Sequence, residues 1–144
     1  MEKIKENMAK KSINPSSPIF ATKDRSTIFA KFGYSAAVRA GDFIYVAGQI
    51  GLNPDGTMPE DDDTQIVNAF DRLKIVLEAA GSSLDDIVEL VSYHVGLQKH
   101  LMRFVEIKSR YLKDPYPTWT ILEIAGLARP GIVIEIKAVA YSPR

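Results

Sequence analysis

The chain has 144 residues, 46% of them hydrophobic, and 18 basic side chains balance 18 acidic ones; these values are typical of one globular domain. Zero formal charge gives no long-range attraction to nucleic acid or to an anionic membrane. The absence of cysteine excludes disulfides, thiolate metal sites and a cysteine nucleophile, and two histidines (His94 and His100) are little material for a metal centre. A reducing compartment is compatible with this composition, and we expect a cytoplasmic protein without a metal or other cofactor.

The first 25 residues are predicted to be a flexible or draped extension, and residues 26–144 a single domain. Residues 1–11 mix lysines with glutamates and lack the continuous apolar core of a secretory signal. Residues 14–18 read Asn-Pro-Ser-Ser-Pro and would break a helix, because proline lacks the amide donor and restricts the residue before it.

The domain is predicted to open with a hairpin followed by a helix. β-branched and aromatic residues on both sides of a Gly-Asp turn predict strands at 35–39 and 43–50. Three aspartates at 61–63 are interpreted as helix N-cap candidates rather than as metal ligands. Apolar residues spaced by three and four then predict a helix that ends at Gly81; they are Ile66, Phe70, Leu73 and Leu77.

The second half of the chain completes the order β-β-α-β-α-β-β, which predicts an α+β fold with a mixed sheet and two helices on one face. Its elements are a strand at 87–95, a helix over 101–112, and strands at 118–125 and 132–141. Two helices cover only one face, yet strands 43–50 and 132–140 are apolar on both faces. Because burying apolar area is worth about 25 cal/mol per Å², we expect a homo-oligomer with pockets between subunits. A monomer whose tail covers that face is the alternative.

Glu135 is the residue whose placement most suggests chemistry. It stands within an apolar strand (Val-Ile-Glu-Ile-Lys), where a lone carboxylate is costly unless it is paired or hydrogen-bonded. Two interpretations stay open: an ion pair with Lys137 on the same face, or an acid–base or water-orienting group at a pocket. Tyr34 could offer a hydroxyl to a ligand, although tyrosine at a strand start usually serves packing. Glu123 is a weaker candidate, and His94 is interpreted as a satisfied, half-buried histidine.

Five segments carry a family resemblance through their order and spacing. They are Gly-Tyr at 33–34 leading into Ser-Ala-Ala-Val, Gly-Asp-Phe-Ile-Tyr-Val-Ala-Gly-Gln-Ile at 41–50, Ala-Phe at 69–70 with Leu-Lys ahead of Leu-Glu-Ala-Ala-Gly at 77–81, Tyr-Pro-Thr-Trp-Thr at 116–120, and Ile-Glu-Ile-Lys-Ala-Val-Ala at 134–140. From about Gly33 onward the chain resembles the Rid family, also called the YjgF/YER057c/UK114 or endoribonuclease L-PSP family. The resemblance implies a chorismate-mutase-like fold of the bacillus type that forms homotrimers with ligand clefts between subunits.

The resemblance also implies hydrolytic deamination of reactive enamines and imines such as 2-aminoacrylate. Family members that act this way match Tyr34 as a cleft residue and Glu135 as the carboxylate that positions water. The family's arginine for the substrate carboxylate falls at Trp119, its cleft serine at Ala47 and its frequent cysteine at Ile121. Because an indole cannot replace a charged, bidentate guanidinium, we expect a substrate other than 2-aminoacrylate.

Three functions are compatible with these residues. The first is a deaminase for a larger, aromatic or semialdehyde-like substrate, on which Trp119 stacks while Arg39, Arg129 or Lys137 holds any carboxylate. The second is a non-catalytic small-molecule-binding or chaperone-like trimeric module, in which Trp119 packs the cleft wall. The third is an endoribonuclease, against which the zero net charge argues. We expect a small-molecule partner, no membrane partner and no nucleic acid.

Overall fold

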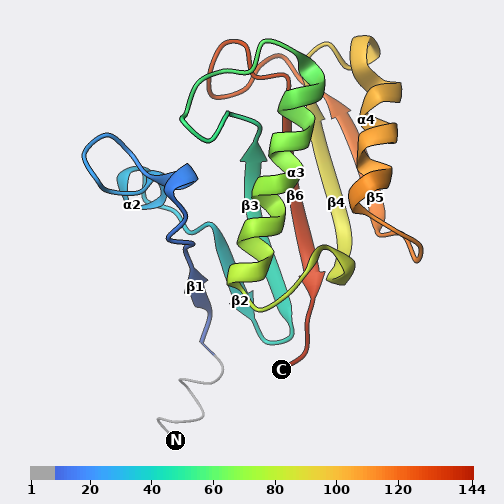
Figure 1. Ribbon diagram of the computed structural model, residues 1–144. Coiled ribbons are helices and arrows are strands. Elements are labelled where there is room, and N and C mark those ends of the chain that lie inside the picture. Colours follow the sequence, from blue (N-terminus) through green and yellow to red (C-terminus); the bar gives the residue numbers. More distant parts are fainter. Residues whose placement is uncertain (1–8) are drawn as a thin grey trace, which may run out of the picture.

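The computed structural model describes residues 9–144, and Figure 1 shows their arrangement. The predicted element order is confirmed from β2 onward, with β1, η1 and α2 added before it and η2 before β4. The elements are β1 (Lys11–Ile13), η1 (Pro18–Phe20), α2 (Ile28–Phe32), β2 (Ala37–Ala40), β3 (Phe43–Ile50), α3 (Asp62–Ala79), η2 (Leu84–Asp86), β4 (Ile87–His94), α4 (Leu97–Tyr111), β5 (Thr118–Glu123) and β6 (Ile134–Tyr141).

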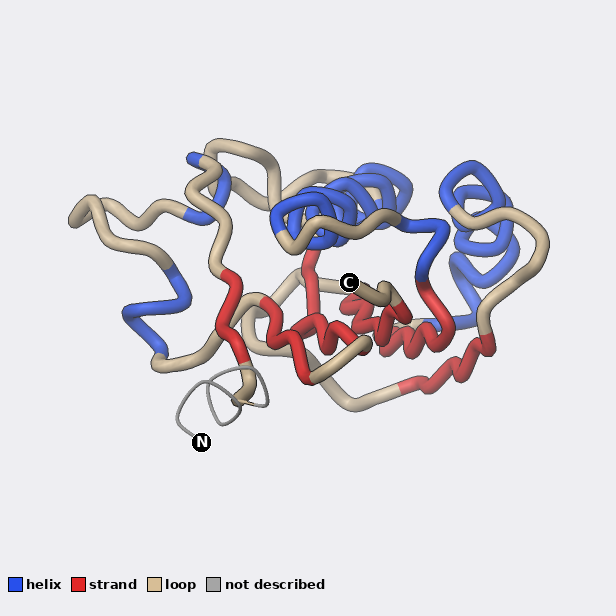
Figure 2. Tube along the Cα trace, turned by 90° about the horizontal axis from the view of Figure 1, so that it is seen from below, coloured by secondary structure: helices blue, strands red, loops and turns tan. Residues whose placement is uncertain are grey.

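The six strands form one mixed sheet in the order β1-β2-β3-β6-β4-β5. Neighbouring strands are antiparallel except β4 and β5, which are parallel and joined through α4. Figure 2 shows α3 and α4 side by side on one face of the sheet, which confirms the predicted α+β architecture. No helix in the described residues is long and apolar enough to cross a membrane.

The helix α3 forms where the aspartates and the apolar stripe predicted it. Asp61 is the N-cap, and its carboxylate accepts a 2.6 Å hydrogen bond from the amide of Thr64. All four stripe residues are fully buried against the sheet, and Gly81 beyond the end has the positive φ of a helix stop. Helix α4 begins at Leu97, earlier than predicted, and the residue before it is Gly96, which offers no side chain to cap the helix and so gave no N-cap signal in the sequence.

The segment before α2 lies along the domain from residue 11 onward. β1 pairs with β2, and Phe20 is buried with its ring 5.0 Å from that of Phe29. The predicted boundary at residue 25 stays a prediction, and the first part of the predicted extension, residues 1–8, lies outside the described residues.

The face of the sheet opposite the helices exposes large apolar side chains. Phe43 and Tyr141 are paired across β3 and β6 with rings 5.4 Å apart, yet both are at least 40% exposed. Tyr45 and Leu122 lie on the same face and are also exposed. This is the face for which the two strands that are apolar on both sides predict a covering partner.

Candidate functional site

Tyr34 and Glu135, the two predicted catalytic residues, line one pocket of about 240 Å³. The pocket lies beside residues 47–50 of β3, beyond the point where β2 stops pairing with that strand. Its remaining lining is mostly apolar and comes from η1, α2, β3, α3 and the loops that follow β3 and β5; the residues are Phe20, Ile28, Phe29, Phe32, Gly48, Gln49, Ile50, Leu52, Arg72 and Ala128. A small apolar hollow with a few polar groups is typical of a small-molecule site.

A bulge in β3 gives Glu135 access to this pocket. Between Val46 and Gln49 the register against β6 shifts, so that β3 carries one extra residue there. Gly48 lies in the bulge, and a Cβ built on it would fall 2.6 Å from Glu135 Cδ. The Glu135 carboxylate therefore occupies the space that a side chain at position 48 would fill.

The Glu135 carboxylate is half-buried and has no ion-pair partner among residues 9–144. Lys137, the partner considered from the sequence, is exposed and forms no salt bridge with it. Burial raises the pKa of the Glu135 carboxyl above its ordinary value of 4.5. Of the two interpretations of this residue, the acid–base or water-orienting group at a pocket is the one this geometry supports.

Tyr34 is held at the pocket by the short helix α2. Thr27 caps that helix, and Gly33 adopts a left-handed conformation (φ 72°) that turns the chain back, so the Tyr34 amide bonds the Phe29 carbonyl at 3.0 Å. The Tyr34 ring packs edge-on against Phe29. Burial, and then the negative charge of Glu135, raise the pKa of the Tyr34 phenol. The phenol is therefore a neutral donor at pH 7.

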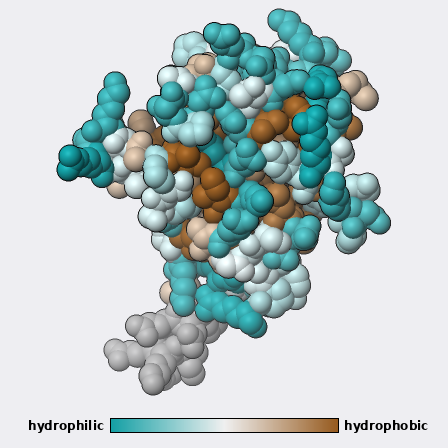
Figure 3. All heavy atoms as spheres, viewed as in Figure 1, coloured by the Kyte–Doolittle hydropathy of each residue, from teal (hydrophilic) through white to brown (hydrophobic). Residues whose placement is uncertain are grey.

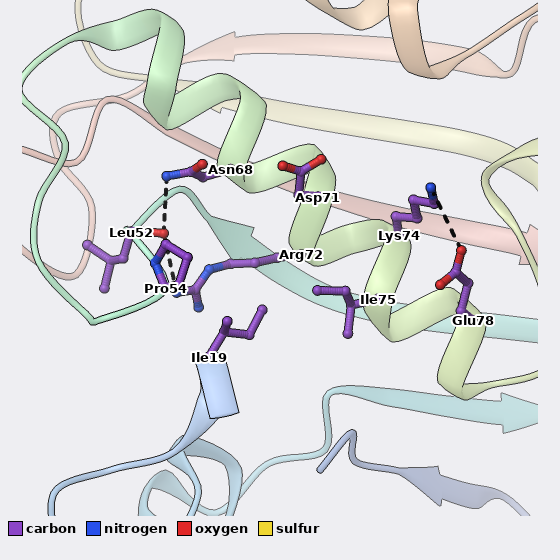
Figure 4. Close-up of a pocket in the computed structure, with 9 residues that line it drawn as sticks. All are labelled: Ile19, Leu52, Pro54, Asn68, Asp71, Arg72, Lys74, Ile75 and Glu78. Atoms are coloured by element: carbon purple, nitrogen blue, oxygen red, sulfur yellow. Dashed lines mark hydrogen bonds and ion pairs between the residues drawn. The ribbon is translucent and has the colours of Figure 1, made fainter. Parts of the chain in front are cut away.

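A larger groove of about 410 Å³ lies between η1, α3 and the loop after β3 (Figure 4). Figure 3 shows apolar surface exposed between the N-terminal segment and α3. The two acidic residues that line this groove have partners: Glu78 lies 4.0 Å from Lys74, and Asp71 accepts a 2.8 Å hydrogen bond from the Tyr111 hydroxyl. Both carboxylates that line this groove among residues 9–144 have partners, so the smaller pocket is the stronger candidate for chemistry.

The three residues predicted to bind substrate are not all near this pocket within one chain. Ala47 lies next to Gly48 in the bulge, although it does not line the pocket. Trp119 and Ile121 are on β5, at the other end of the sheet order, with β4 between β5 and β6. A single copy of the chain therefore supplies Tyr34 and Glu135 together, and Trp119 and Ile121 separately.

Trp119 is fixed toward the helices by a buried polar chain. Its indole N–H donates to Ser92 Oγ at 2.9 Å, and Ser92 Oγ lies 2.8 Å from His94 Nε2. His94 Nδ1 lies 2.9 Å from His100 Nε2, and His100 Nδ1 is 3.3 Å from an Asp62 oxygen without a hydrogen bond between them. Ser92 and both histidines are buried.

The groups at the two ends of this buried polar series, the Trp119 indole and the Asp62 carboxylate, determine where its protons lie. The indole nitrogen is only a donor and an ionised carboxylate only an acceptor. We therefore assign the Ser92 hydroxyl as the donor to His94 Nε2, and the His94 Nδ1–H as the donor to His100 Nε2. That leaves the remaining His100 proton on Nδ1, toward Asp62. Burial, followed by the neighbouring His100, lowers the pKa of His94 to about 4.

This buried histidine is expected to make the protein less stable as the pH falls from 6.5 to 4. The unfolded chain binds a proton at His94 near pH 6.5, whereas the folded chain resists protonation until about pH 4. The free energy of unfolding should therefore fall by up to about 3 kcal/mol across that window. Urea unfolding can be followed by fluorescence of Trp119, the only tryptophan. The variant His94→Gln should lose this part of the pH dependence, and an unchanged slope in the variant would contradict the assignment.

Comparison with known proteins matches the endoribonuclease L-PSP family to residues 25–142. The chain belongs to the Rid (endoribonuclease L-PSP) family. A Rid relative, the RutC family protein YjgH of Escherichia coli, is 38% identical over 120 residues, which cover 83% of this chain and 90% of that protein. A solved structure of protein YjgH has a TM-score of 0.81 at 33% identity and covers 94% of this chain and 98% of that one. A relative from Dermatophagoides farinae, 29% identical over 74% of this chain and 83% of its own length, is named 2-iminobutanoate/2-iminopropanoate deaminase.

Sequence reasoning missed two polar features of this Rid protein. Arg72 lines the pocket from α3, but in the sequence it looks like an ordinary charged residue between the buried Phe70 and Leu73. The contact between His94 and His100 crosses the turn from β4 to α4, and their spacing matches no known ligand or catalytic pattern. The alternation Ser-Tyr-His at 92–94 in an apolar strand was the available signal for a buried polar pair.

Proposed function

We propose that this Rid protein catalyses the hydrolytic deamination of a small reactive imine or enamine. Water adds to the imine carbon, the resulting carbinolamine loses ammonia, and a carbonyl compound remains. Glu135 would accept a proton from the attacking water and return it to the departing nitrogen, while the Tyr34 hydroxyl would orient the substrate or the water. The observation that carries the proposal is the half-buried Glu135 carboxylate, which has no ion-pair partner in the described part of the chain and lies with Tyr34 in an apolar pocket.

The deaminase named among the relatives supports this reaction class. The substrate we propose is not 2-aminoacrylate, because Trp119 replaces the family's carboxylate-binding arginine and its indole N–H already donates to Ser92. The apolar lining of the pocket by three phenylalanines favours a substrate with a larger apolar or aromatic side chain.

We further propose that the active form is a homotrimer in which Trp119 and Ile121 of one copy close the cleft of the next. The exposed Phe43, Tyr45 and Tyr141 on the uncovered sheet face support association, because such a patch favours burial against a partner. Light scattering on dilute protein should give three times the 16.0 kDa mass of the chain. A stable species of one chain mass would contradict the trimer.

The reaction is tested by generating imines in place with an amino-acid oxidase and measuring ammonia release. The panel should run from alanine through leucine to phenylalanine, with catalase present. We expect added protein to speed ammonia release from the imines with larger side chains, in proportion to protein concentration. No acceleration for any imine would contradict it, and binding without turnover would favour the non-catalytic binding module.

A further inference from the structure

Arg72 is a buried cation with most of its hydrogen-bonding capacity unused. The side chain extends from α3 toward Leu52, as Figure 4 shows, and the residue is only 8% exposed. Of its five N–H donors, only those on Nη2 have acceptors among residues 9–144, the carbonyls of Leu52 at 3.3 Å and Asn53 at 3.4 Å. In the described part of the chain no carboxylate lies within salt-bridge distance, and its guanidinium is 5.5 Å from the centre of the Phe20 ring.

A buried guanidinium with few hydrogen bonds and no nearby carboxylate favours the binding of an anion. Taking a charge out of water is costly unless an opposite charge or several hydrogen bonds compensate it, and two long bonds to carbonyls compensate only in part. A carboxylate is a suitable ligand because both its oxygens accept hydrogen bonds in the geometry that a guanidinium offers.

Arg72 is also placed where such an anion would meet the reacting groups. It lines the same pocket as Tyr34 and Glu135, and no other lysine or arginine within residues 9–144 does so. Burial raises the pKa of the Tyr34 phenol most, the charge of Glu135 raises it further, and the charge of Arg72 lowers it.

We propose that Arg72, which reaches this pocket from α3, binds the carboxylate of the substrate. This inference rests on the proposed deaminase function and adds the residue that holds the carboxylate of a substrate with an apolar side chain. The carboxylate would bind Arg72, the imine carbon would lie near Tyr34 and the water on Glu135, and the side chain would pack among the phenylalanines.

The other cations are less suited to this role. Arg39 is buried, and its guanidinium already donates to the carbonyls of Gly41, Ser142 and Ala80. Lys137 lies on the uncovered face of the sheet in a different hollow. Lys108 is the serious competitor, because its ammonium lies 4.9 Å from the centre of the Trp119 ring and forms no ion pair with the described residues. It could reach this pocket only from a second copy.

The test measures binding of two stable carboxylates, 2-oxobutanoate and phenylpyruvate, to the full-length protein by calorimetry. The variant Arg72→Gln keeps a donor for the Leu52 carbonyl but removes the charge, and it should weaken both carboxylates about 10- to 100-fold. The neutral methyl esters should bind wild type and variant equally. Lys108→Gln is the matched control and should leave binding unchanged. Unaltered affinity in folded Arg72→Gln, or the loss appearing in Lys108→Gln instead, would overturn the proposal.

A second measurement on unaltered protein covers the case in which Arg72→Gln does not fold. The Nε–H resonance of Arg72 in a nitrogen-15 spectrum should shift on titration with phenylpyruvate, and an unmoved resonance at saturation would also overturn the proposal. If the protein binds carboxylates through Arg72 but is not a deaminase, binding would still depend on Arg72 while no ammonia is released. Binding of neither carboxylate to wild type counts against the Arg72 site, even if imine hydrolysis is observed.

Discussion

Replacing Glu135 by glutamine should lower the rate of ammonia release about 10²- to 10⁴-fold, the usual contribution of a general base. The substitution keeps the size of the side chain and its place over Gly48, but it removes the group that takes the proton from water. The effect should fall on kcat, with little change in KM, because a substrate bound through Arg72 does not depend on the Glu135 charge. The measurement is steady-state ammonia release with the best imine of the panel.

Loss of folding is not expected to explain this result. Burial raises the pKa of Glu135, so its stabilising contribution is complete below pH 4.5 and is lost as the pH rises through the raised value. At pH 7 the neutral glutamine should therefore leave the protein at least as stable as wild type. Glu89→Gln, an exposed carboxylate on the same face of the sheet, is the matched control. Full activity in Glu135→Gln, or an equal loss in Glu89→Gln, would remove Glu135 from the reaction.

Replacing Trp119 by arginine should create or raise hydrolysis of 2-aminoacrylate at least about 10-fold, the effect of one added charge-assisted contact to a small carboxylate. In the proposed trimer the new guanidinium would reach the neighbouring cleft. The change removes a half-buried ring that packs 5.7 Å from the centre of Phe104, so a stability loss of about 1–3 kcal/mol should accompany it. The measurement compares 2-aminoacrylate with the best larger imine.

The buried Ser92 oxygen needs its own control, because it could bind the new guanidinium as it binds the indole N–H. The double variant Trp119→Arg with Ser92→Ala removes that acceptor and should show the larger gain. Trp119→Leu opens the same space without a charge and should show none. An equal gain in Trp119→Leu would mean that space, and not the lack of a cation at position 119, limits the reaction with 2-aminoacrylate.

The sequence predicted the central part of the fold because local signals and burial agree there. Asp61 and the apolar stripe of α3 define the helix by themselves, and the turn before Phe43 defines the hairpin. Glu135 was found because it is a charged residue within an apolar strand. A residue that does not fit its local pattern often marks a functional site.

The parts that sequence reasoning missed depend on contacts between distant segments. β1 has three residues and exists only because it pairs with β2, and η1 places Phe20 on Phe29 across a proline-rich stretch. The bulge at Gly48 has no local signature that separates it from a strand glycine. Arg72 looks exposed in the sequence because nothing local shows that η1 and the loop after β3 cover it.

The most direct test of the Glu135 assignment is the pH dependence of kcat/KM for imine hydrolysis, which reports ionisation in the free protein and free substrate. We expect kcat/KM to fall on the acid side with a midpoint above pH 4.5, since the reacting form is the ionised, half-buried carboxylate. In Glu135→Gln that limb should vanish, while any limb due to the substrate itself remains. The same acid limb in both proteins, or none in wild type, would contradict the account.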